Sequence, residues 1–165
     1  MSGVDPQLRK FLATAANAFR FQVDISAPAR SGRAIDAAER KLLRAREESQ
    51  RADMRDGEEL LKYSYEAILA ACQALVFALG YTSGANSELG HSGVFSFARA
   101  ACSKIATELD GPLDRINSTV RPLRNKAQYD HVYPTLDEAR DAFEDAVLLV
   151  ESLREAVGEV SASRG

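Results

Sequence analysis

Polar residues that could act on a phosphate group are concentrated in one short stretch of this chain, residues 121–134. Arg124 and His131 stand seven residues apart there, which on an α-helix is two turns and nearly the same face. A permanently charged guanidinium and an imidazole that titrates near neutral pH can together hold a phosphate and move a proton. The same stretch supplies further polar side chains, namely Arg121, Asn125, Tyr129 and Asp130. The spacing alone is equally compatible with a helix end that carries a few surface polar residues.

The overall composition is that of an ordinary soluble globular chain. Of the 165 residues, 45% are hydrophobic and 27% are charged, which fits one domain with a buried core. The formal net charge of −3 gives no global basic field of the kind that marks nucleic-acid binders, although it does not exclude a local basic patch. The sequence shows neither an apolar signal-peptide core nor a stretch of about 18 consecutive apolar residues. We therefore expect a cytoplasmic protein without a membrane segment.

The cysteines and histidines do not indicate metal or thiol chemistry. Cys72 and Cys102 lie far apart inside aliphatic helical patterns, so we expect buried free thiols in a reducing compartment. His91 and His131 are forty residues apart and do not form a ligand cluster. His91 is expected to pack or cap at a helix start, with Ser92 as the N-cap residue. We expect neither a metal nor another cofactor.

Helical periodicity dominates the chain, and no β-alternation or internal repeat is visible. A first helix opens at Asp5-Pro6 and runs to Phe21, and a Gly/Ser/Pro-containing connector follows it. We expect residues 1–32 to be an appendage, residues 33–160 to form the bundle, and residues 161–165 to be a disordered tail. The expected core helices cover residues 34–56, 58–79, 92–109, 113–130 and 135–160. The predicted fold class is an all-α antiparallel bundle of four to five core helices.

Local signals refine several of these helices. The helix after Gly57 is apolar nearly all round from Tyr63 onward, which is typical of a central helix. Pro122 removes a backbone donor and should kink its helix just before Arg124. Thr135 and Glu138 form a capping box at the start of the last helix.

Two helical faces leave alternatives open. Residues 34–56 carry a basic stripe opposite their apolar face: Arg33, Arg40, Arg44, Arg51 and Arg55. This stripe is interpreted as a solvated face with intrahelical ion pairs, and the alternative is a ridge that contacts phosphates. The last helix has a long apolar seam, which can pack within the bundle or against a partner helix.

Two motifs in a fixed order carry a resemblance to a known family. His91-Ser-Gly-Val94 opens a helix, and an arginine-x-x-alanine-x-tyrosine-aspartate pattern lies before the last helix, at Arg124, Ala127, Tyr129 and Asp130. In this order the chain resembles the HEPN superfamily, and in particular an uncharacterised bacterial group within it. The resemblance covers roughly residues 33–157, about three quarters of the chain. The order of the motifs is fairly specific, whereas each motif alone is not.

The resemblance implies a helical bundle that forms a homodimer. Such proteins are often encoded beside a minimal nucleotidyltransferase in toxin–antitoxin or phage-defence modules, and the catalytic members are metal-independent ribonucleases. Their signature is an arginine, usually a polar residue next, and a histidine after four to six intervening residues. Arg124-Asn125 supplies the opening, and His131 follows after six. Tyr129 occupies the commoner histidine position, which is typical of relatives without established nuclease activity.

Two functional readings follow from this resemblance. In the first, His131 acts as a general base on an RNA 2′-hydroxyl and Arg124 neutralises the phosphorane, with Arg121, Asn125, Tyr129 and Asp130 in support. A single helix would place Arg124 and His131 about 10 Å apart, so dimerisation, the Pro122 kink or fraying must bring them together. In the second reading, the protein is a non-catalytic partner or regulator of a neighbouring enzyme of the nucleotidyltransferase type. A scaffold dimer that binds a nucleotide is a third, weaker alternative.

Overall fold

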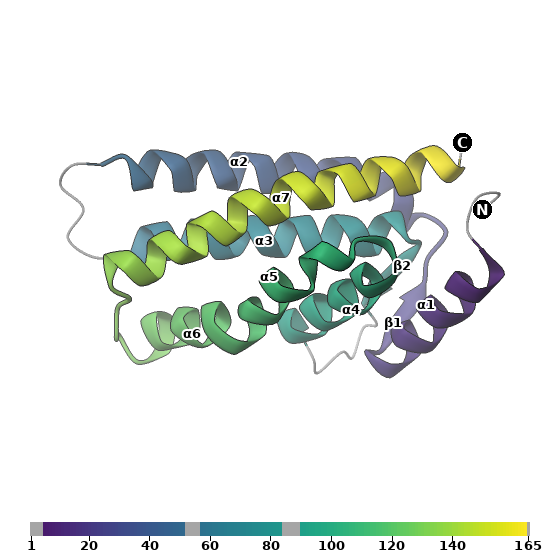
Figure 1. The fold of residues 1–165 in the computed structure, drawn as a ribbon, viewed down its shortest axis with the longest axis horizontal. Helices are drawn as coiled ribbons and strands as arrows, with labels where there is room; N and C mark the ends of the chain where they lie inside the picture. The colour runs from purple at the N-terminus through teal and green to yellow at the C-terminus, as the bar shows by residue number, and fades with distance from the viewer. Residues whose placement is uncertain (1–4, 52–56, 84–89, 165) are drawn as a thin grey trace.

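The computed structural model describes residues 5–51, 57–83 and 90–164, and shows a bundle of helices with one small antiparallel sheet (Figure 1). The N-terminal elements are α1 (Pro6–Ala18), β1 (Phe21–Val23), a short 3-10 helix (Ala27–Arg30) and α2 (Ser31–Ser49). They are followed by α3 (Glu58–Ala78), β2 (Tyr81–Ser83), α4 (Gly90–Ile105) and a 3-10 turn (Thr107–Leu109). The C-terminal part comprises α5 (Asp110–Arg115), a π-helical segment (Ile116–Val120), α6 (Arg121–Tyr129) and α7 (Leu136–Arg164). The predicted all-α class is confirmed.

Helix α3 occupies the centre of the bundle, as its sequence predicts. It packs against α2 and α7 along its length and also contacts α4 and α6. Figure 1 shows α2, α3 and α7 running along the long axis, with α4, α5 and α6 on one side of them. Large apolar side chains of α3 such as Leu60, Leu61, Ile68 and Leu75 are completely buried. Burying an aliphatic side chain of this size contributes roughly 1.5–3 kcal/mol, so α3 organises much of the core.

Helix α1 is part of the bundle rather than an appendage to it. Its apolar face buries Leu12 and Ala16 in the same hydrophobic core as the other helices. The connector after α1 contains β1, which pairs with β2 in antiparallel register, Phe21 opposite Ser83 and Val23 opposite Tyr81. The Phe21 ring stacks on Phe97 of α4, with 4.9 Å between ring centroids. The sequence does not reveal this sheet because three-residue strands are too short to show an alternating pattern.

The predicted helix 113–130 is divided into three parts. Helix α5 leads into the π segment Ile116–Val120, and α6 begins directly afterwards with Pro122 in its first turn. Proline has no N–H to donate to the carbonyl one turn back, so the regular α-helical ladder cannot continue through Pro122. A wider turn before the proline accommodates this loss, and π turns inside helices are often found at functional sites. The predicted interruption is thus present, as a π segment.

The predicted capping box at the start of α7 is confirmed. The Thr135 N–H donates to Glu138 Oε1 at 3.0 Å, and the Glu138 N–H donates to Thr135 Oγ1 at 3.1 Å. The prediction of a disordered tail is wrong for Ser161–Arg164, because α7 continues to Arg164. No glycine or proline interrupts the sequence there, and Val160 still packs against the core. Gly165 lies outside the described residues.

Helix α2 bears on two further predictions, the position of its C-terminal end and the role of its basic stripe. Helix α2 ends at Ser49, earlier than predicted, and the expected continuation over residues 52–56 lies outside the described residues. Within the basic stripe of α2, Arg44 donates to the Tyr63 hydroxyl at 3.0 Å, and the neighbouring Lys41 pairs with Glu66 at 2.9 Å. The interpretation as a solvated face with intrahelical ion pairs fits Arg51, which pairs with Glu48 at 3.4 Å, but not Arg44, which contacts a neighbouring helix.

Both cysteines are buried and free, as predicted. Burial raises the pKa of Cys102 to about 12, so its thiol stays protonated at neutral pH. Among the described residues, α3 alone has the length and composition of a possible membrane span, and 61% of its most apolar window is buried inside the bundle. A core helix gives the same signal, so this is weak evidence for a membrane.

Candidate functional site

Arg124 lies on α6 and reaches towards α3. Its guanidinium carbon lies over the ring of Tyr65, 5.8 Å from the centroid. Nη1 donates a hydrogen bond to Oε1 of Gln128, one turn further along α6. The Nε atom is buried and has no hydrogen-bond partner. A buried charged donor without a protein partner is unusual, and a water molecule or a bound ion can satisfy it. Arg124 is therefore held from two sides but retains unused hydrogen-bonding capacity.

A surface hollow of about 340 Å³ opens on one side of Arg124. Its walls come from the first turns of α3, from α6, and from the segment after α6. The lining residues are Glu58, Glu59, Lys62, Arg124, Ala127, Gln128, His131 and Tyr133. The two residues predicted to carry chemistry, Arg124 and His131, thus line the same hollow.

The backbone at His131 explains how this residue reaches the hollow. Helix α6 ends at Tyr129, and His131 adopts a left-handed conformation with φ of 53°. The next residue, Val132, donates its N–H back to the Lys126 carbonyl at 3.1 Å, so the chain turns sharply. Histidine tolerates this conformation better than β-branched residues do. The separation expected for two residues on one continuous helix therefore does not apply to Arg124 and His131.

Gly57 fixes the position of the segment that follows His131. Its N–H donates to the Pro134 carbonyl at 3.3 Å. A Cβ atom at Gly57 would come within 2.3 Å of the Ala139 Cβ and 2.8 Å of the Thr135 carbonyl oxygen. Only glycine permits so close an approach between the start of α3 and the start of α7. The sequence marks Gly57 as a break in helical pattern, whereas its structural role is this contact beside the hollow.

A second group of side chains lies on the other side of Arg124. The Tyr65 hydroxyl and Nδ1 of His91 are 2.9 Å apart, and Tyr65 is only 4% exposed. His91 belongs to the first turn of α4 and its ring is accessible to solvent. Burial, and then the charges of Arg121 and Arg124, lower the pKa of His91. Burial raises the pKa of Tyr65, and Arg121 and Arg124 oppose this rise.

These pKa directions define the protonation state of the pair. His91 is neutral and Tyr65 keeps its proton at neutral pH, because both pKa values move away from neutrality. Arg121 lies near enough to Tyr65 for its charge to oppose the rise of the Tyr65 pKa. The contact between the two side chains can be made by the Tyr65 O–H donating to Nδ1 of His91. The His91 proton then resides on Nε2, where it can donate to a ligand.

His91 and Tyr65 were not predicted as members of a site. His91 was expected to pack or cap at a helix start, and Ser92 was expected to be the N-cap residue. His91 does pack at the helix start, against Tyr65, whereas Ser92 is not the N-cap residue, because α4 begins at Gly90 and Ser92 lies inside it. The two residues are 26 positions apart on different helices, so no local spacing could reveal their contact. The only sequence signal is the His91-Ser-Gly-Val94 motif.

The other predicted site residues divide into two groups. Arg121 is half-buried and acts on the Tyr65–His91 pair. Asn125, Tyr129 and Asp130 are exposed, and none of them lines the hollow. Tyr129 is 70% exposed, and together with Val132 and Tyr133 it presents apolar surface at the end of α6. Within one copy of the chain, Asn125, Tyr129 and Asp130 therefore do not join Arg124 and His131 in the hollow.

No family model, curated protein or solved structure matches this chain. Across residues 5–51, 57–83 and 90–164, no group of three or more His, Cys, Asp or Glu side chains comes together in a way that could hold a metal ion. The interpretation of the site therefore depends on its own geometry.

Proposed function

We propose that this chain is a HEPN-type, metal-independent endoribonuclease of a toxin–antitoxin or phage-defence module, with Arg124 and His131 in its site. The observation that carries the proposal is that these two side chains line one hollow. The left-handed turn at His131 supplies the change of direction that a continuous helix lacks. HEPN membership itself remains part of the proposal and comes from the motif order.

The proposed reaction uses the RNA substrate's own nucleophile. His131 takes the proton from a 2′-hydroxyl, the 2′-oxygen attacks the adjacent phosphorus, and the bond from phosphorus to the 5′-oxygen breaks. Arg124 stabilises the charge that develops on the non-bridging oxygens. The leaving 5′-oxygen takes up a proton, and the products are a 2′,3′-cyclic phosphate and a 5′-hydroxyl. No metal is required for any of these steps.

A homodimer would complete this site. Glu58 and Glu59 also line the hollow, and their negative charges oppose the approach of a phosphate. A second copy could cover the exposed Tyr129, Val132 and Tyr133 and bring the polar side chains of its own α6 to the hollow. Asn125 and Tyr129 would then contact RNA bound between the two copies.

The test is RNA cleavage by the purified protein in EDTA, with His131→Ala and Arg124→Ala variants whose oligomeric state is confirmed. Loss of cleavage in both variants, with 2′,3′-cyclic ends in the wild-type products, is the expected result. Lys126→Ala is the matched control, since it removes an exposed positive charge from α6 outside the hollow. Wild-type protein without cleavage, or cleavage indifferent to His131, would contradict the ribonuclease.

The second candidate is a non-catalytic binding partner of a nucleotidyltransferase-type enzyme. The exposed apolar side chains Tyr129, Val132 and Tyr133 favour it, because such surface normally marks a contact with another protein. The acidic net charge also suits a protein partner better than RNA. Co-purification with the transferase encoded beside it, lost on Val132→Asp but kept on Leu43→Asp elsewhere on the exposed surface, would support this candidate.

A further inference from the structure

The two arginines beside Tyr65 have no acidic partner among the described residues, in contrast to several other arginines of the bundle. Arg30, Arg99, Arg115 and Arg154 each pair with a carboxylate of the same or a neighbouring helix or turn. Among the described residues, neither Arg121 nor Arg124 takes part in an ion pair. Both act instead on Tyr65 and His91. Like charges brought together in this way repel each other unless an anion lies between them.

The remaining groups of the cluster are also hydrogen-bond donors. In the tautomer in which the Tyr65 O–H donates to Nδ1 of His91, the Nε2–H of this exposed histidine is left to donate to a ligand. Nε of Arg124 is buried without a partner. His91 stands in the first turn of α4, so the positive end of that 16-residue helix lies beside it. His91 of α4 and Arg124 of α6 thus both contact Tyr65 of α3 and bring donors from two helices close together.

The hollow on the other side of Arg124 has a different charge balance. Glu58 and Glu59 line it together with Lys62 and Arg124. Among the described residues, the charged side chains that act on the Tyr65–His91 pair are the two arginines. These charges attract an anion to the side of Arg124 that faces Tyr65.

We propose that Tyr65, His91, Arg121 and Arg124 form a binding site for a phosphate group. The two guanidiniums and Nε2–H of His91 hold the oxyanion, and Tyr65 is a positioning residue that orients the imidazole and supports the Arg124 guanidinium. The shared chemistry is a tetrahedral dianion, supplied either as free inorganic phosphate or as the phosphate of a nucleotide. This site does not depend on RNA cleavage and does not require His131.

The chain offers a direct measurement, because its two histidines give two resolvable imidazole signals in an NMR spectrum. His131→Ala removes one of them and assigns the other to His91. Titration of the full chain with sulfate, which stays a dianion throughout, should shift the His91 signal and raise the pKa of His91. The His131 signal should remain in place.

Variants distinguish specific sulfate binding at these four residues from a general attraction of sulfate to positive charge. Arg121→Gln and His91→Gln should each weaken sulfate binding about tenfold or more, as expected for loss of one charge-assisted contact. Tyr65→Phe keeps the buried ring, and it should weaken binding while the melting temperature shows that the bundle is folded. The matched control Lys126→Gln removes one positive charge from α6 and should leave binding within about twofold. Equal losses in Arg121→Gln and Lys126→Gln, or a shift of His131 in place of His91, would overturn the proposal.

Two further titrations identify whether the bound phosphate is the free anion or part of a nucleotide. Inorganic phosphate and a nucleoside 5′-monophosphate are compared, with the uncharged nucleoside as the control. Tighter binding of the monophosphate identifies a nucleotide ligand, and equal binding identifies the free anion. Binding of the nucleoside as tightly as its monophosphate would contradict a phosphate site. Because His131→Ala is expected to abolish cleavage but preserve anion binding, failure of the ribonuclease and failure of this site are distinguishable.

Discussion

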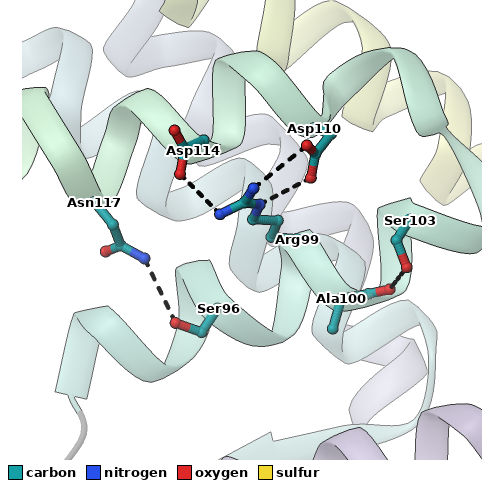
Figure 2. A network of polar contacts seen from close by, with 7 residues as sticks. All are labelled: Ser96, Arg99, Ala100, Ser103, Asp110, Asp114 and Asn117. Carbon is teal, nitrogen blue, oxygen red and sulfur yellow. Dashed lines mark hydrogen bonds and ion pairs between the residues drawn. The ribbon is translucent and has the colours of Figure 1, made fainter.

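Arg99 and Arg124 occupy similar half-buried surface positions but have opposite surroundings. Figure 2 shows Arg99 of α4 between two carboxylates, with Nε 2.8 Å from Asp110 and Nη1 2.8 Å from Asp114. These contacts join α4 to both ends of the short helix α5, and Asn117 of the π segment adds a weak contact to Ser96, at 3.5 Å. Arg124 is placed by the Tyr65 ring and by the neutral amide of Gln128. The comparison shows that Arg99 is neutralised by the acids it joins to α4, whereas Arg124 is placed by neutral groups and its charge is not matched by an acid among the described residues.

The largest expected effect comes from the close packing of Gly57 against the start of α7, beside the hollow that Arg124 lines. Gly57→Ala should lower the free energy of unfolding by roughly 1–3 kcal/mol, because the new Cβ overlaps Ala139 and the Thr135 carbonyl. The backbone shift should also reduce activity that depends on the hollow. Chemical denaturation measures the stability. Gly158→Ala, in α7 with open space around its Cβ, is the control and should stabilise by up to about 1 kcal/mol. An unchanged Gly57→Ala protein would contradict the packing argument.

An acidic partner for Arg124 should remove the difference between this arginine and Arg99. Gln128→Glu preserves the shape of the side chain and creates an ion pair with Arg124 one helical turn away. We expect sulfate binding to weaken about tenfold, since the arginine becomes neutralised as Arg99 is. Gln22→Glu, on the exposed edge of β1, adds the same charge elsewhere and should have little effect. Binding that survives Gln128→Glu would show that Arg124 does not hold the anion.

Replacement of Arg99 tests the arginine that is paired with carboxylates. Arg99→Gln removes the contacts to Asp110 and Asp114 and should lower the stability only slightly, because these ion pairs are solvent-exposed. The loss should shrink at high salt, and anion binding should stay the same. Urea denaturation at low and high ionic strength measures the loss of stability, and titration of the His91 signal with sulfate measures anion binding. A marked loss of anion binding in Arg99→Gln would remove the distinction between the two arginines.

The smallest expected effect concerns pH. Burial and then the charges of Arg121 and Arg124 lower the pKa of His91, so the folded state favours the neutral imidazole. The stability that depends on this neutral form is present above the unfolded pKa of about 6.5 and is lost as pH falls through the lower folded value. In Arg121→Gln the pKa of His91 should rise towards its usual value, and this loss should diminish. NMR titration measures the pKa, and a value unchanged by Arg121→Gln would place that guanidinium away from His91.

The sequence predicts those parts of the molecule that depend on local patterns. The central position of α3 follows from its apolar residues on every side, and the start of α7 follows from the Thr135–Glu138 capping box. Pro122 correctly indicates an interruption near Arg124, but the missing donor alone does not specify a π segment. A disordered tail is predicted from residue 161, whereas α7 continues to Arg164, because residues 161–164 contain no glycine or proline to end it.

The candidate site is less predictable, because its contacts join residues far apart in the sequence. Spacing on one helix identifies Arg124 and His131, but the left-handed turn that places His131 depends on how the chain returns to α7. The Tyr65–His91 contact depends on the packing of α3 against α4. Neither residue has a local pattern that marks it as a neighbour of Arg124. The sequence therefore identifies His131 as a neighbour of Arg124, whereas Tyr65 and His91 are identified as neighbours only by the fold.

The π segment Ile116–Val120 also sets the helical phase of everything that follows it. A π turn is equivalent to one additional residue within an α-helix, and one residue corresponds to a rotation of about 100°. Arg115, before the segment, faces α7 and pairs with Asp145, while Arg124, after it, faces Tyr65 of α3. Deleting a single residue such as Ser118 would return the helix to regular phase and turn Arg121 and Arg124 away from α3 together. A one-codon insertion or deletion at this point could thus create or remove the whole cluster without altering any residue that belongs to it.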